Sequence, residues 1–254
     1  MRKQLRVILG ALLLLMSSHA RADEAEKDLA LISNYQPTYF LLGHPDTKAQ
    51  FSFKAQILRP YPVYFGFTQL IIWDLFKVSR PIREINYHPE LYYRFHLGDE
   101  GDRDWFDFVP YEHESNGKAE LLSRSWNRTS LVYHAKRKWS SSVEAIWRLK
   151  LSIPVFREET NLDLPQYRGI WELSFTLGGF LGGYFEADDL TVRIYPGGRS
   201  WIDPFKGGQE LTFRTKAKWG SLLLPAVLQF FHGYGEDLLE YKQNRIAFRA
   251  GLGF

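Results

Sequence analysis

The chain of 254 residues contains no cysteine, and its net charge is only +3. The absence of cysteine excludes a disulfide framework and a thiol nucleophile. It does not argue against export, because many exported proteins fold without disulfide bonds. The 32 basic residues are scattered among 29 acidic ones. This mixture is typical of a solvated surface, so we expect no nucleic-acid partner.

Long apolar runs are also lacking. An apolar segment over residues 7–16 follows a basic start and precedes Ala20-Arg21-Ala22. This is the pattern of a secretory signal peptide, and the segment is too short for a transmembrane helix. We therefore expect a signal peptide over residues 1–22, with cleavage after Ala22. No later run has the length that a spanning helix needs.

Aromatic residues and alternating strands are what the sequence does have. Aromatic residues make up 16% of the chain. Apolar and polar residues alternate with a period of two over residues 51–57, 143–153, 210–219 and 245–254. Alternation predicts strands with one apolar face. The polar face repeatedly carries Lys, Arg and Glu, and several segments reach about ten residues, the length of a tilted strand that crosses a bilayer.

We count about eleven or twelve such segments, and because bacterial single-chain barrels have even numbers of strands, we predict twelve. The sequence therefore predicts an all-β fold, a twelve-stranded antiparallel transmembrane β-barrel of the outer-membrane type over residues 51–254. Residues 23–50 are expected to form a periplasmic or lumen-associated N-terminal segment. A soluble periplasmic β protein also alternates, but its strands are usually shorter. A passive outer-membrane channel, with the polar face lining a pore, remains an alternative.

Two short motifs suggest hydrolase chemistry, namely residues 111–117 (YEHESNG) and 123–127 (SRSWN). His113 and Ser115 are two residues apart in a predicted strand, so their side chains point to the same side. Asn116-Gly117 predicts a turn. A hairpin loop centred on residue 120 places Asn127 opposite His113, within hydrogen-bonding reach.

The parity of these strands predicts where the motif points. Glu112 and Glu114 alternate with His113 and Ser115. If the charged residues face the barrel interior, the uncharged pair faces lipid, and Asn127 does the same on the next strand. Polar side chains on a lipid-facing surface are costly, which favours a functional role over chance.

His113, Ser115 and Asn127 supply a general base, a nucleophile and a group that orients the base, as in serine hydrolases. Asn127 is neutral, so it stabilises an imidazolium less than an aspartate would. Backbone N–H groups, water or a metal must then support the oxyanion. A histidine and a serine two residues apart also occur together by chance. The chemistry alone leaves other esters, such as lipid A, open as substrates.

The two motifs resemble those of the outer membrane phospholipase A family, Y-x-H-x-S-N-G followed by S-R-S-W-N. Residues 79–90 are similar to the family segment S-x-P-x-R-E-x-N-Y-x-P, and residues 233–236 and 241–254 resemble its last hairpin. The resemblance spans most of the chain after residue 22. It implies a twelve-stranded enzyme barrel of the Gram-negative outer membrane.

The resemblance further implies hydrolysis of sn-1 and sn-2 acyl esters of phospholipids and lysophospholipids, with His113, Ser115 and Asn127 as the triad. It implies a Ca²⁺-dependent homodimer with its clefts at the interface. The family's calcium ligands correspond to Ser123, the backbone carbonyl of Lys118 and, across the dimer, Ser79. The family commonly has arginine where this chain has Lys118. The loop over residues 119–122 is also less polar here.

Overall fold

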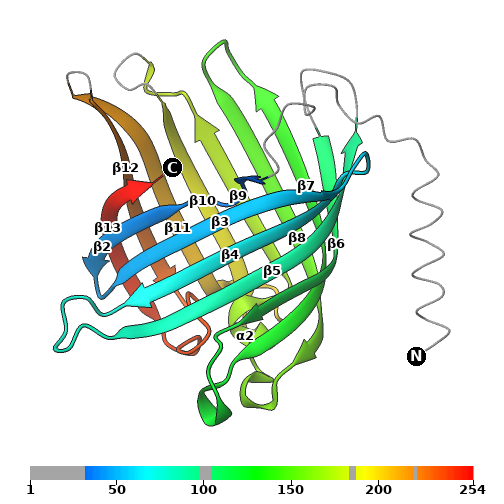
Figure 1. The fold of residues 1–254 in the computed structure, drawn as a ribbon, viewed down its shortest axis with the longest axis vertical. Coiled ribbons are helices and arrows are strands. Elements are labelled where there is room, and N and C mark those ends of the chain that lie inside the picture. The colour runs from blue at the N-terminus through cyan, green and yellow to red at the C-terminus, as the bar shows by residue number, and fades with distance from the viewer. Residues whose placement is uncertain (1–31, 98–103, 183–186, 220–221, 254) are drawn as a thin grey trace.

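The fold is a closed antiparallel β-barrel (Figure 1), in a computed structural model that describes residues 32–97, 104–182, 187–219 and 222–253. The strands are β1 Ile32–Asn34, β2 Tyr39–His44, β3 Thr47–Leu58, β4 Val63–Trp73, β5 Ile82–Leu97, β6 Asp104–Ser115, β7 Ser125–Lys138, β8 Glu144–Arg157, β9 Trp171–Gly178, β10 Asp188–Gly197, β11 Asp203–Trp219, β12 Leu222–Gly233 and β13 Arg245–Gly253. Short helical turns lie in loops at one rim, at η2 Glu120–Leu122, η3 Glu159–Asn161 and α2 Pro165–Arg168.

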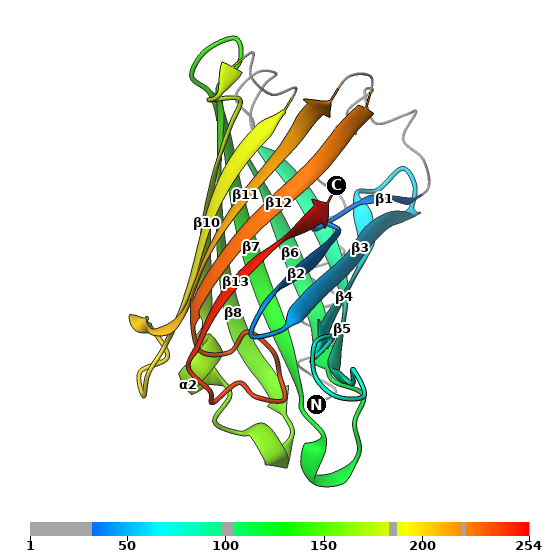
Figure 2. The ribbon, with the colours of Figure 1, turned by 90° about the vertical axis from the view of Figure 1, so that its left-hand side faces the viewer.

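Neighbours in sequence pair around the barrel, and β2 closes it by pairing with both β13 and β3 (Figure 2). The strand β3 pairs with β4 along one edge, so β1 and β2 share its other edge. They are therefore two parts of one interrupted strand, and the barrel has twelve strand positions. This confirms the predicted twelve-stranded antiparallel barrel of the outer-membrane type.

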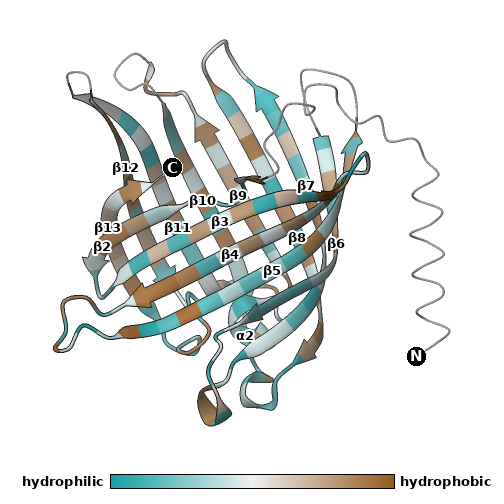
Figure 3. Cartoon of the chain, viewed as in Figure 1, coloured by the Kyte–Doolittle hydropathy of each residue, from teal (hydrophilic) through white to brown (hydrophobic). Residues whose placement is uncertain are grey.

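Alternation separates the two faces of the wall, as the banded hydropathy of the strands indicates (Figure 3). In β8 the side chains of Leu149, Leu151 and Ile153 are exposed, whereas Lys150 between them is buried. In β13 Phe248 is 62% exposed and its neighbour Arg249 only 3%. The apolar side chains thus face outward and the charged ones inward, which is the reverse of a soluble protein and suits a lipid environment.

The barrel begins earlier than predicted. Residues 39–44 form β2 and β3 starts at Thr47, so the boundary placed at residue 51 lies inside a barrel strand. The alternation of β2 is hard to recognise because the strand has only six residues. The predicted signal peptide, residues 1–22, lies outside the described residues. In the described ranges, no helix is long and apolar enough to cross a membrane.

Ion pairs and aromatic stacking occupy much of the lumen. Lys48 on β3 donates to Glu210 on β11 at 3.0 Å and to Glu236 beyond β12 at 3.2 Å. Between β1 and β2, Tyr35 stacks on Tyr92 with ring centroids 5.6 Å apart. A polar cavity of about 690 Å³ remains inside. These contacts join strands that are far apart around the barrel and stiffen it.

Candidate active site

The strands β6 and β7 bring two of the predicted site residues into contact. His113 and Asn127 are directly opposed in the antiparallel ladder, as the predicted hairpin requires. The imidazole Nδ1 lies 2.6 Å from Asn127 Oδ1. Because an amide oxygen only accepts, Nδ1 carries the proton and donates it, which leaves Nε2 with a free lone pair. That is the tautomer a general base needs.

Ser115 lies two residues beyond His113, at the end of β6, and both side chains are half-buried on the outer face. Ser115 is paired with Tyr87 on β5, and Asn127 is paired with Phe156 on β8. The aromatic rings of these two neighbours are 37% and 57% exposed. Aromatic side chains therefore flank the three polar residues on the lipid-facing wall and provide apolar surface on both sides.

Parity correctly predicts the interior face of the same strands. Glu112 is 0% exposed and Glu114 is 6% exposed, so the carboxylates point into the barrel while His113 points outward. The interior carboxylates form ion pairs with Arg128 on the neighbouring strand. One pair of strands thus presents charged groups inside and a His–Asn hydrogen bond outside.

The loop after Ser115 is organised by Asn116, whose side chain is 4% exposed. Its Nδ2 donates to the carbonyl of Leu122 at 2.9 Å. Its Oδ1 accepts from the backbone N–H of Lys118 at 3.2 Å and of Arg124 at 3.0 Å. The sequence marks this residue only as a turn former, yet it holds both arms of the loop that follows Ser115.

The predicted calcium ligands lie at the same rim of the barrel. Lys118 and Ser123 belong to the β6–β7 loop, and Ser79 is exposed in the β4–β5 loop with φ +63°. Ser123 Oγ donates to Glu158 Oε2 at 2.8 Å, and Ser125 Oγ donates to the same oxygen at 3.0 Å. The carboxylate of Glu158, from the β8–β9 loop, therefore lies against Ser123. The sequence did not predict this contact, because 35 residues separate the two.

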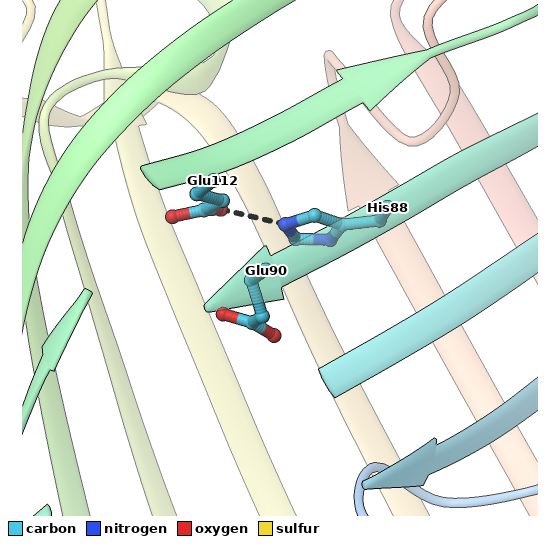
Figure 4. A group of neighbouring side chains, drawn as sticks. All are labelled: His88, Glu90 and Glu112. Atoms are coloured by element: carbon cyan, nitrogen blue, oxygen red, sulfur yellow. Dashed lines mark hydrogen bonds and ion pairs between the residues drawn. The ribbon is translucent and has the colours of Figure 1, made fainter. Parts of the chain in front are cut away.

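A second group of side chains has the composition of a metal site, but cationic side chains already balance its carboxylate charge. His88, Glu90 and Glu112 bring their ligand atoms within 4.8 Å of one another inside the barrel (Figure 4). Glu112 Oε1 also accepts from Arg128 and, at 2.6 Å, from Lys150. A divalent cation would have to compete with both side chains. We therefore assign this group to the ion-pair network of the lumen.

Comparisons with known proteins identify the family of this chain. A family model described as Phospholipase A1 matches residues 11–254. The chain is 30% identical to the Phospholipase A1 of Escherichia coli K12 over 79% of this chain and 68% of that protein. It is 27% identical to a Putative phospholipase A1 of Neisseria meningitidis serogroup B over 82% of this chain, and it spans about half (54%) of that relative.

Solved structures share the fold at lower identity. The outer membrane phospholipase A of Escherichia coli superposes with a TM-score of 0.69 at 22% identity, covering 88% of this chain and 94% of that one. A Salmonella typhi outer membrane phospholipase, solved as a dimer with bound calcium, gives 0.70 at 22% identity and covers 90% and 94%.

Proposed function

This chain belongs to the phospholipase A1 family, and we propose that it is a calcium-dependent enzyme of the outer membrane that hydrolyses the sn-1 and sn-2 acyl esters of phospholipids and lysophospholipids. The observation that carries the proposal is the pairing of His113 with Asn127 beside Ser115, on the lipid-facing side of the barrel. A reactive group there meets acyl esters without the lipid having to enter the lumen.

The His113–Asn127 hydrogen bond orients the base of the proposed reaction. The Nε2 of His113 removes the proton of Ser115 Oγ as the oxygen attacks the ester carbonyl, and Asn127 holds the imidazole in place. The same proton then passes to the departing alcohol, a lysophospholipid or glycerophosphodiester. Water, deprotonated by His113, cleaves the acyl-serine and releases the fatty acid. Each step uses one base and one nucleophile, and the enzyme is regenerated.

Calcium suits the oxygen donors found at this rim. The hydroxyl of Ser123, the carbonyl of Lys118 and the nearby carboxylate of Glu158 are hard oxygen ligands, which Ca²⁺ prefers. We assign Ser123 and the Lys118 carbonyl as ligands, with Ser79 of a second subunit completing the site. When bound there, the ion would supply positive charge for a developing oxyanion. A structural neighbour solved as a dimer with bound calcium supports calcium as the ion and a dimer as the assembly.

The alternative of a passive channel has less support. Glu172 on β9 binds Arg148 at 2.6 Å and Arg193 at 3.0 Å, so charges that would line a pore are paired with each other. The aromatic stack of Tyr35 on Tyr92 further narrows the interior. Lipid A as substrate is chemically compatible with the same triad, and it is an outcome of the test below.

The test compares purified parent and Ser115→Ala protein in mixed micelles of a defined phospholipid, with and without Ca²⁺. The parent should release fatty acid only with calcium, and the variant should show no release above background. Parallel reactions with lysophospholipid and with lipid A assign the substrate. A parent that releases no fatty acid from any phospholipid, or a variant as active as the parent, contradicts the proposal.

A further inference from the structure

We propose that Glu114, Trp126 and Arg128 act as positioning residues that hold His113 and Asn127 in register from the interior side of the barrel wall. This inference rests on the proposed catalytic role of that pair. None of these three side chains can touch a substrate outside the barrel, because they are all buried on the opposite face. Their effect must pass through the backbone of β6 and β7.

The ladder of β6 and β7 places the His113–Asn127 pair between two buried pairs. Three successive cross-strand pairs are Glu112–Arg128, His113–Asn127 and Glu114–Trp126. The outward-facing catalytic pair is therefore enclosed by two inward-facing pairs. Each inward pair is cross-linked by a side-chain bond: Arg128 donates to Glu112, and Trp126 Nε1 donates to Glu114 Oε2 at 3.0 Å.

The two inward pairs are also joined to each other. Arg128 Nη2 reaches diagonally to Glu114 Oε2 at 3.1 Å. Its guanidinium lies 3.9 Å from the centroid of the Trp126 ring, a contact that combines stacking with cation–π attraction. The Arg128 side chain thus spans the position at which His113 and Asn127 meet on the outer face. Sliding β6 against β7 would break several of these contacts together.

This part of the wall needs side-chain support because its backbone ladders are irregular. The pairing of β6 with β7 shifts between Val109 and Glu112, and that of β7 with β8 shifts between Asn127 and Arg128. Bulges interrupt the ladder hydrogen bonds and re-aim side chains, often beside active sites. With a shift directly beside Asn127, the backbone alone specifies its orientation weakly.

The Trp126 ring also connects the wall to the rim. It is fully buried in a cluster with Leu164, Leu238 and Tyr241, which come from the β8–β9 and β12–β13 loops. From the first of these loops Arg168 approaches Glu114 to 3.6 Å. The loops therefore pack against the indole ring, and Glu114 accepts the hydrogen bond of its N–H. Such packing keeps a side chain in one rotamer, which a positioning residue requires.

The charges of the cluster favour positioning over direct electrostatic help to the imidazolium. Three carboxylates, those of Glu90, Glu112 and Glu114, face three cations, Arg128, Lys150 and Arg168. The group therefore carries no excess negative charge that could replace the aspartate missing from the triad. Its contribution is geometric, and it should appear in kcat and not in substrate binding.

The test uses Glu114→Gln and Trp126→Phe, each alone and combined with Asn127→Ala. Trp126→Phe retains an aromatic ring over Arg128 but removes the N–H donor and part of the buried ring, whereas Glu114→Gln changes the acceptor with little change in volume. Each single variant should lower kcat about tenfold while KM and calcium affinity stay within twofold. In the Asn127→Ala background, each substitution should lower kcat by less than a further twofold, because there is no longer a His–Asn bond to position.

Glu172→Gln is the matched control. Its carboxylate is also a lumen carboxylate bound to two arginines, but it lies on β9 and its hydrogen bonds go to β8 and β10. This variant should keep kcat within twofold. Heat-modifiable gel mobility establishes that every variant is folded.

Unchanged kcat in both folded single variants would overturn the inference. So would an equal loss of kcat in Glu172→Gln. A double variant whose loss of kcat equals the product of the losses in the single variant and in Asn127→Ala would overturn it as well. Ser115→Ala, assayed alongside, separates this outcome from failure of the proposed function. If Ser115→Ala retains activity, the triad assignment itself fails, whatever the behaviour of Glu114.

Discussion

Replacing Asn127 with alanine removes the acceptor that His113 Nδ1 uses at 2.6 Å. A hydrogen bond contributes about 0.5–1.5 kcal/mol between neutral groups and about 1.5–3 kcal/mol when one partner is charged. A general base has to be neutral before it takes the proton of the nucleophile, and it is charged afterwards. Only the difference between these two energies enters kcat, and about 1–1.5 kcal/mol corresponds to a roughly 5- to 13-fold lower kcat.

The assay is initial-rate fatty acid release at saturating Ca²⁺, with KM measured on a short-chain substrate. KM should stay near the parent value, because Asn127 is bonded to His113 and has no assigned substrate contact. Thr129→Val is the matched control. Thr129 lies two residues along the same face of β7 and donates to the Pro110 carbonyl on β6 at 3.0 Å. This variant loses one cross-strand bond but leaves the His–Asn pair intact, so kcat should stay within twofold.

An Asn127→Asp variant, which keeps an acceptor oxygen, should retain more activity than Asn127→Ala. The reasoning is refuted if Asn127→Ala keeps kcat within twofold of the parent. It is equally refuted if Thr129→Val loses as much, since the effect would then come from the strand pair as a whole.

Three further predictions concern the rim. Chelation of Ca²⁺ should abolish fatty acid release and lower the dimer fraction seen by crosslinking. Adding Ca²⁺ back should restore both. A chelated monomer that is as active as the calcium-bound protein contradicts this. Glu158→Gln, which removes the negative charge bonded to Ser123, should weaken calcium affinity about tenfold by titration and leave kcat at saturating calcium nearly unchanged; unchanged affinity would assign Glu158 a role in loop structure alone. Burial by itself would raise the pKa of Glu236, but the cations Lys48 and Arg249 lower it to about 2. The stability that this carboxylate provides is therefore present above pH 4.5 and lost as the pH falls toward 2. In Glu236→Gln, the drop in the free energy of unfolding between these pH values, measured by urea titration, should be smaller by on the order of 3 kcal/mol. An unchanged pH profile contradicts this.

The wall of the barrel was predictable because alternation is a local property. The exposed Leu149, Leu151 and Ile153 and the buried Lys150 of β8 can be read directly from their spacing. The start of the barrel was not predictable in this way. Its first strand position is divided at residues 35–38, and β2 pairs mainly with β13, at the far end of the chain. Such pairing leaves no local pattern in a strand of six residues.

The site residues likewise differ in how far local sequence predicts their contacts. The outward direction of His113 and its pairing with Asn127 follow from parity and loop length, and both predictions agree with the ladder. The roles of Asn116 and Glu158 depend on contacts that loops make after folding, one of them across 35 residues. No spacing in the sequence indicates that Trp126 Nε1 donates to Glu114 instead of to water.

A reactive site on a lipid-facing wall faces a particular physical problem. Its residues cannot be surrounded by other protein on the outer side, because the substrate must arrive there, so few outward contacts can fix their rotamers. A strand solves this by alternation: the residues on either side of His113, Glu112 and Glu114, are buried, and each is bonded to a residue of β7. The lumen can then hold the dense polar network that lipid would not tolerate. The closed barrel therefore supplies, from within, the rigidity that the proposed triad on its outer face needs.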